Sequence, residues 1–103
     1  MHYLLFYEFV HDYVERRSEL RAEHLRLAWE SNDRGELILA GTLADPVDTG
    51  VLLFNCDSPD VVERFVAADP YFKRGLVKSH RIRPWTTVIG KDATTPVRPE
   101  PRS

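Results

Sequence analysis

The stretch that decides the fold is Asp69-Pro70-Tyr71-Phe72-Lys73-Arg74-Gly75-Leu76, which separates a helical segment from an extended one. Asp69 precedes a proline, and this position is driven from helical toward extended backbone geometry. Its carboxylate can cap a new helical turn that begins at Pro70. Gly75 suits the backbone geometry of a helix end. The stretch therefore predicts that one helix ends near residue 68 and that the last strand begins at residue 77.

The remaining chain alternates between extended and helical patterns. Strands are expected at residues 2–9, 37–44, 51–56 and 77–89, and helices at residues 12–33 and 58–68. This order predicts an α+β domain of the ferredoxin-like βαββαβ kind with an antiparallel sheet. Right-handed crossovers would place both helices on one face of that sheet. Gly41 suggests a bulge or a close backbone approach in the second strand, and Pro84 suggests an edge or a bulge in the last.

The first strand predicts an association between two copies of the chain. Tyr3, Leu5 and Tyr7 alternate with Leu4 and Phe6, so both faces of this strand are apolar. The helices cover only one face, and an apolar face of this size is rarely left to water. We therefore expect a homodimer in which two open sheet faces stack.

Length and composition indicate a single domain with a short extension. The chain has 103 residues, a net charge of −2 and an apolar share of 43%. Residues 1–90 are expected to form the domain, and the proline-rich residues 91–103 are expected to be a disordered tail. Because basic and acidic residues are interspersed, no nucleic-acid partner is predicted.

No membrane partner is predicted either, because no apolar run approaches the roughly 18 residues of a membrane span. The N-terminus lacks the pattern of a signal peptide. The single cysteine, Cys56, cannot form an intramolecular disulfide and is interpreted as a small apolar residue. These features favour a cytoplasmic protein.

The four histidines do not form a recognisable metal site. No two of them have the i, i+4 spacing of a helical zinc site, and no cysteine pair exists. His2, His11 and His80 are interpreted as surface or packing residues. We therefore predict no metal and no cofactor.

His24 is the principal candidate for chemistry because it lies on an apolar helical stripe with Leu20 and Leu27. A buried imidazole needs hydrogen-bond partners. In a ferredoxin-like fold, Asp69 at the end of the second helix can approach it. The carboxylate would fix the tautomer and leave the opposite ring nitrogen free for proton transfer. The alternative is a core histidine bonded to backbone, with Asp69 as a plain helix cap.

Two further residues are candidates for substrate contact. Arg21 lies one helical turn before His24 and can hold either an anionic substrate group or a surface carboxylate. Tyr71 can place a phenol near His24 or pack its ring in the core.

The segments Arg21-Ala22-Glu23-His24-Leu25, Leu39-Ala40-Gly41 and the stretch from Asp69 to Leu76 resemble the YciI-like (YCII-related) family over residues 1–89. The resemblance implies a dimeric α+β barrel and a site pair that maps onto His24 and Asp69. Thr42 stands where many relatives have proline, and the loop at residues 45–50 is short, so the pocket mouth is expected to differ. Dehydrochlorination of chlorinated aromatics is associated with one branch of the family, and nothing in this sequence selects it.

These observations predict a small cofactor-independent enzyme that uses His24 and Asp69 for general acid–base chemistry on a small organic molecule. An isomerase or a lyase fits this description, since one positioned proton-transfer group typically contributes about 10²–10⁴-fold. The alternative is a non-catalytic module of the same fold that binds a small ligand or has a regulatory role, because fold alone does not decide function.

Overall fold

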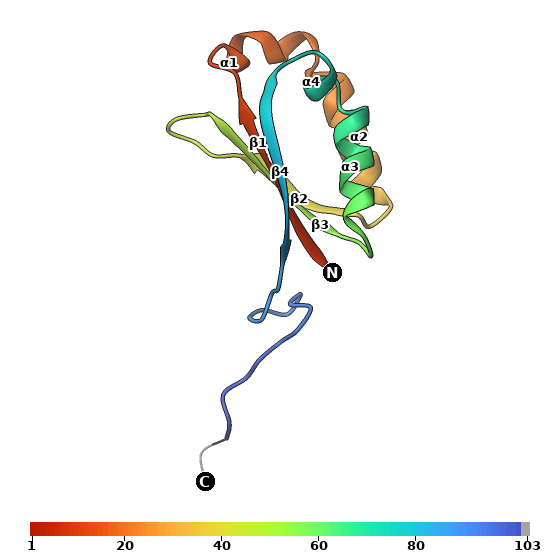
Figure 1. Cartoon of the computed structure of the whole chain (residues 1–103), viewed down its shortest axis with the longest axis vertical. Coiled ribbons are helices and arrows are strands. Elements are labelled where there is room, and N and C mark those ends of the chain that lie inside the picture. Colours follow the sequence, from red (N-terminus) through yellow and green to blue (C-terminus); the bar gives the residue numbers. More distant parts are fainter. Residues whose placement is uncertain (102–103) are drawn as a thin grey trace.

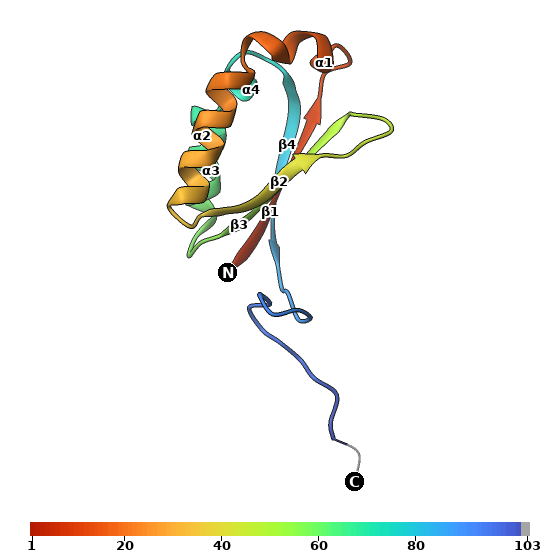
Figure 2. The ribbon, with the colours of Figure 1, turned by 180° about the vertical axis from the view of Figure 1, so that it is seen from behind.

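A computed structural model of the chain describes residues 1–101. Four antiparallel strands form one sheet in the order β2-β3-β1-β4, and the helices cover one of its faces (Figures 1 and 2). The strands are β1 (His2–Phe9), β2 (Leu37–Thr42), β3 (Thr49–Asn55) and β4 (Val77–Trp85). The predicted α+β, ferredoxin-like architecture is therefore confirmed.

The first helical segment is divided, whereas a continuous helix at residues 12–33 was predicted. It contains α1 (Tyr13–Arg16), the 3-10 turn η1 (Arg17–Glu19) and α2 (Arg21–Asp33). The interruption lies at Leu20, where φ is −110° and no side chain caps the junction. No stop signal marks this point in the sequence, because residues 15–20 contain neither glycine nor proline.

The second helical segment follows the prediction closely. Ser58 caps α3 (Pro59–Ala68) by accepting a hydrogen bond of 3.1 Å from the Asp60 amide. Asp69 ends α3 and caps α4 (Pro70–Lys73). The chain leaves α4 through Gly75, whose φ of +80° is easily adopted only by glycine.

Three strands differ from their predicted bounds, since β2 ends at residue 42, β3 begins at residue 49 and β4 ends at residue 85. The prediction of a bulge or a close backbone approach at Gly41 is wrong. The register shift in β2 lies between Leu37 and Leu39, and a Cβ at Gly41 would meet nothing within 4 Å. Pro84 lies on β4, an edge strand, where its missing N–H is tolerated.

The segment after β4 contains no helix or strand up to residue 101, but part of it folds back. The Thr95 amide donates to Thr87 O at 3.0 Å, and the Val97 amide donates to Val88 O at 2.9 Å. The expected boundary at residue 90 therefore falls inside this turn. Figure 1 shows the chain running away from the domain beyond it. The end of the expected tail, residues 102–103, lies outside the described residues.

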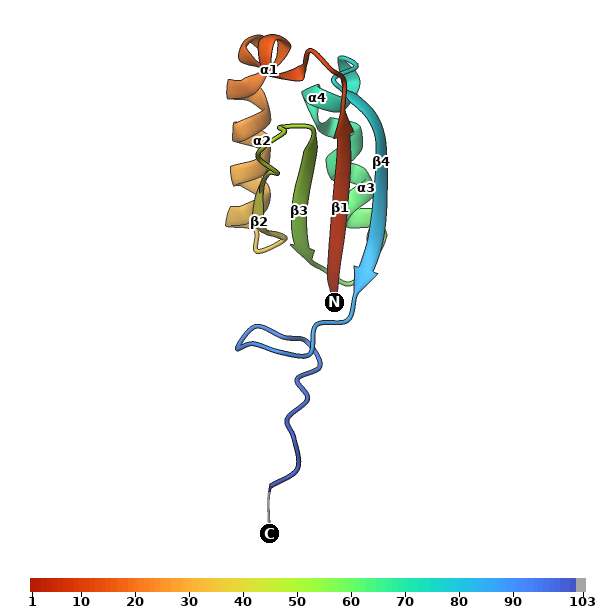
Figure 3. The same cartoon turned by 90° about the vertical axis from the view of Figure 1, so that its left-hand side faces the viewer.

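The two faces of the sheet differ in their cover. Side chains on the helical face of β1 are buried, and they include Tyr3, Leu5, Tyr7 and Phe9. Leu4 and Phe6 on the opposite face are only half-buried. Figure 3 views this open face, with the helices behind the sheet. Any polar side chain between helices and sheet is therefore held in a largely apolar layer.

Candidate active site

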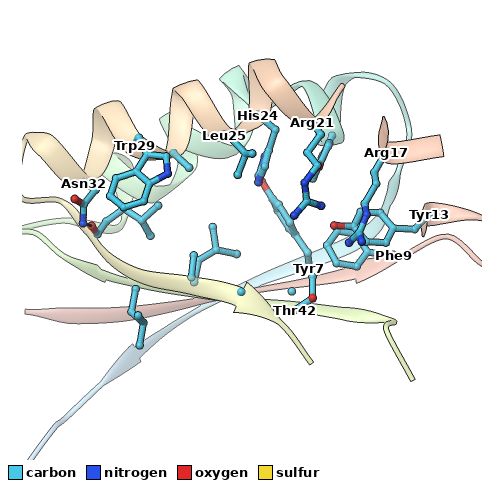
Figure 4. A pocket seen from close by; sticks show the side chains of 18 of the residues that line it. Tyr7, Phe9, Tyr13, Arg17, Arg21, His24, Leu25, Trp29, Asn32 and Thr42 are labelled. Carbon is cyan, nitrogen blue, oxygen red and sulfur yellow. Dashed lines mark hydrogen bonds between the residues drawn. The ribbon is translucent and has the colours of Figure 1, made fainter. Parts of the chain in front are cut away.

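A cavity of about 340 Å³ lies between α2 and the edge strand β2 (Figure 4). One wall is a stripe of α2 side chains spaced three or four residues apart, the spacing of one helix face. The floor is the helical face of the sheet around Gly50 and Leu52. The α2 residues are Arg21, His24, Leu25, Ala28, Trp29 and Asn32. The volume is at the small end of the range for ligand sites.

Asp69 is the buried centre of the polar network beside this cavity. It is 0% exposed, and its carboxylate accepts three hydrogen bonds. Oδ1 accepts from His24 Nδ1 at 2.8 Å and from the Tyr71 amide at 3.0 Å, and Oδ2 accepts from Tyr7 Oη at 2.8 Å. A buried carboxylate is tolerated only when it is paired and hydrogen-bonded, which these three donors provide. Asp69 is thus both a helix cap and the hydrogen-bond partner of His24, so the two roles considered for it from the sequence occur together.

His24 is held by contacts on its edge and on its face. Because the Asp69 carboxylate can only accept, Nδ1 carries the proton in this bond. The imidazole ring also stacks on the Tyr71 ring, with centroids 3.9 Å apart and planes 9° from parallel. Within residues 1–101, Nε2 has no hydrogen-bond partner, and His24 lines the cavity. The expected contact with Asp69 is present, while a catalytic role for the pair stays a prediction.

Tyr7 is the member of the network that sequence reasoning missed. Its side chain is 1% exposed, and its hydroxyl donates to Asp69. Burial, and then the charge and hydrogen bond of Asp69, raise the pKa of Tyr7 far above its ordinary value. A signal was available, because a tyrosine on the inner face of a strand must find a partner for its hydroxyl.

Tyr71 serves mainly as a platform for His24. It is 2% exposed, and its ring stacks on His24 and lies perpendicular to the Tyr13 ring, with the centroids of the two tyrosine rings 5.6 Å apart. Burial raises the pKa of Tyr71 to about 12, although the nearby Arg21 and Arg17 charges act in the opposite direction. Tyr71 therefore packs in the core and also lines the cavity, and its contact with a substrate stays a prediction.

Arg21 lies at the cavity, as the anion-binding alternative requires, and has no carboxylate within 4.0 Å among residues 1–101. Arg17 accompanies it one turn earlier and was not singled out from the sequence. Its guanidinium lies 5.3 Å from the centroid of the Tyr13 ring. The outer end of the cavity thus carries two positive charges beside aromatic rings.

The part of the chain that the structure describes contains no group of three or more His, Cys, Asp or Glu side chains placed to hold a metal ion. None of its helices has the length and apolar character needed to cross a membrane.

The architecture identifies the fold class of the chain, which is an α+β domain with the fold of the dimeric α+β barrel proteins. The sequence profile of the YCII-related domain matches residues 1–86, and the chain therefore belongs to the YCII-related family. No protein of curated function matches it in sequence.

Two solved structures have the same fold. One is 5-chloro-2-hydroxyhydroquinone dehydrochlorinase (TftG) from Burkholderia phenoliruptrix in complex with 2,5-dihydroxybenzoquinone, with a TM-score of 0.70 and 21% identity over 84% of this chain and 95% of that one. The other is protein Atu4242 from Agrobacterium tumefaciens, with a TM-score of 0.56 and 15% identity over 91% and 98% of the two chains. At these identities the likeness shows the fold alone.

Proposed function

We propose that this protein is a small cofactor-independent enzyme that moves a proton on a small organic molecule, in an isomerase- or lyase-type reaction. His24 Nε2 accepts or donates the proton, and Asp69 holds the imidazole and stabilises its charged form. Arg21 and Tyr71 contact the substrate. The observation that carries the proposal is a buried, fully partnered Asp69 bonded to Nδ1 of a histidine that lines the cavity.

The geometry favours His24 as the reacting group over its neighbours. Tyr7 is fully committed to Asp69, and its raised pKa keeps the phenol protonated. His24 remains partly accessible, with 17% of its side chain exposed. A histidine can exchange protons near neutral pH, so the accessible nitrogen suits a general base or acid.

The chemistry of one structural relative agrees with this class. The Burkholderia enzyme is a dehydrochlorinase, and loss of hydrogen chloride requires a base to take up a proton. Its complex with 2,5-dihydroxybenzoquinone shows that the same fold binds a single-ring molecule. We take from this the reaction class and the substrate size, and not the particular substrate.

The test is conversion of candidate substrates by the wild type and by His24→Gln. Chloride release from chlorinated hydroxyhydroquinones and solvent-deuterium uptake into activated carbonyl compounds, followed by NMR, report the proton transfer. We expect His24→Gln to lower the rate by about 10²–10⁴-fold. His80→Gln is the matched control, because His80 lies on β4 near Glu63 and does not line the cavity.

Two results would count against the proposal. An unchanged rate in His24→Gln would remove His24 from the mechanism. Saturable binding without conversion of any compound would favour the alternative, a ligand-binding or regulatory module.

We also propose that the chain is a homodimer through its open sheet face. Strand pairing places Leu4, Leu53 and Leu39 in one row across this face, and Phe6 and Val51 in the next. Leu39 is 72% exposed in the single chain. Size-exclusion chromatography with light scattering at micromolar concentration is expected to give twice the mass of 11.9 kDa. A monomer would overturn this part.

A further inference from the structure

We infer that the outer end of the cavity is an anion subsite formed by Arg17 and Arg21, and that the ligand is a single-ring aromatic acid. Its negative charge would reside on a carboxylate or on an acidic ring oxygen. This inference rests on the proposed function, because it assigns the substrate class of the same cavity.

Both arginines line the same end of the cavity, and no counter-charge accompanies them among the described residues. Arg17 and Arg21 are four residues apart across the junction of η1 and α2, and both line the cavity. Within the described residues neither has a carboxylate within 4.0 Å. Like charges at this spacing repel each other, and a bound anion would relieve that repulsion.

The neighbouring Arg16 differs from these two arginines because its guanidinium has partners within the chain. It forms an ion pair of 3.7 Å with Asp12 and donates to Arg74 O at 3.2 Å. Arg16 does not line the cavity. The chain therefore directs one arginine to its own surface and the next one to the cavity.

Arg17 is also held in a suitable orientation. Its guanidinium lies over the Tyr13 ring, which stacks on Phe9 with centroids 3.7 Å apart. A guanidinium that uses its face on an aromatic ring keeps the N–H groups of its edge available. These groups match a carboxylate or a pair of adjacent oxygens.

The remaining walls indicate a flat, apolar body for the ligand. Figure 4 shows Arg17 and Arg21 at one end of the cavity, Trp29 and Asn32 at the other, and His24 between them. Aromatic side chains provide much of the lining, namely Tyr7, Phe9, Tyr13, Trp29 and Tyr71. A volume of about 340 Å³ accommodates one ring with its substituents. An anion held by the arginines would thus bring the ring beside His24.

The experiment measures binding of three probes of similar size by NMR titration of the protein. The probes are benzoate, 2,5-dihydroxybenzoquinone and the neutral benzamide. We expect benzoate or the quinone to bind at least tenfold more tightly than benzamide. Arg17→Gln and Arg21→Gln should each remove most of this preference, since charge-assisted hydrogen bonds are the strong ones. Arg16→Gln, which removes the same charge outside the cavity, should leave it unchanged.

The probes distinguish the two sources of charge, and the variants distinguish the two proposals. Tight binding of benzoate assigns a carboxylate, and tight binding of the quinone alone assigns acidic ring oxygens. Equal affinity for charged and neutral probes, no saturation by either anion at millimolar concentration, or an equal loss in Arg16→Gln would overturn the subsite. In His24→Gln the anion preference should persist, so a failure of the proposed catalysis leaves the subsite standing.

Discussion

Two groups of side chains at the cavity are built on opposite principles. We call Tyr7, His24 and the Asp69 carboxylate behind them the inner wall, and Arg17 and Arg21 at the outer end of the cavity the outer wall. On the inner wall, Asp69, His24 and Tyr7 form a network in which the buried carboxylate has three donors. On the outer wall, Arg17 and Arg21 have no carboxylate partner within the described residues. The inner wall is therefore part of the folded core, whereas the outer wall is available to a ligand.

Because of this difference, we expect the inner wall to contribute to folding stability and the outer wall to ligand recognition. A buried polar network is stabilising only while all its members are present, and removal of one member exposes the others to an apolar surrounding. Surface charges contribute little to folding. Substitutions on the inner wall should therefore lower the free energy of unfolding, whereas those on the outer wall should lower affinity and change stability little.

The largest effect is expected for Asp69→Ala. The change deprives a buried tyrosine hydroxyl, a buried amide and His24 of their acceptor at once. Each buried donor left without an acceptor typically costs about 1–3 kcal/mol, so the combined loss should reach about 3–5 kcal/mol. Urea denaturation followed by circular dichroism measures this loss, and Asp69→Asn, which keeps an acceptor oxygen, should lose less. A loss below about 1 kcal/mol would mean that the network is not a structural unit.

Tyr7→Phe should have the next largest effect. It leaves Asp69 Oδ2 without its donor, and an unsatisfied buried acceptor typically destabilises by about 1–3 kcal/mol. The effect depends on pH in a defined direction. Because the pKa of Tyr7 in the folded state lies above 10.0, its contribution is fully present below pH 10 and is lost as the pH rises further.

Denaturation curves at pH 7 and pH 11 check this prediction. The wild type should lose more stability between these two conditions than Tyr7→Phe, which has no phenol to ionise at this position. Equal losses in the two proteins would contradict it.

The contrast between the walls also shows which features were readable from the sequence. The position of Asp69 before Pro70 predicted the cap, and the apolar stripe around His24 predicted an inward-facing ring. The alternation of β1 predicts that Tyr7 lies on the inner face of the sheet, but it does not name the partner of the tyrosine hydroxyl. Arg17 was not singled out because the continuous helix expected there gives no sign of the break at Leu20.

Gly50→Ala should disturb the floor where the walls meet. A Cβ at this position would lie 2.9 Å from Phe9 Cζ and 3.4 Å from Tyr7 Cβ, so the Phe9 ring must move. We expect a loss of about 1–2 kcal/mol, within the usual range for overpacking. Gly41→Ala is the control, because its Cβ would meet nothing within 4 Å and should cost no stability. A similar loss at both positions would assign the effect to the glycine backbone and not to crowding.

The smallest effect, and the one that separates the walls most sharply, is expected for Arg21→Gln. Removal of one guanidinium relieves repulsion from Arg17 four residues away, so stability should rise by about 0.2–0.5 kcal/mol or stay constant. The stability of Arg16→Gln should fall by a similar amount, because Arg16 forms an ion pair with Asp12 that the substitution removes. Matched thermal denaturation at low salt measures this difference in sign. If Arg21→Gln destabilised the protein more than Arg16→Gln, Arg21 would contribute to folding stability, and the outer wall would resemble the inner one.

A gain in stability together with a loss of anion affinity would mean that Arg21 is retained for binding, at a small expense in folding free energy.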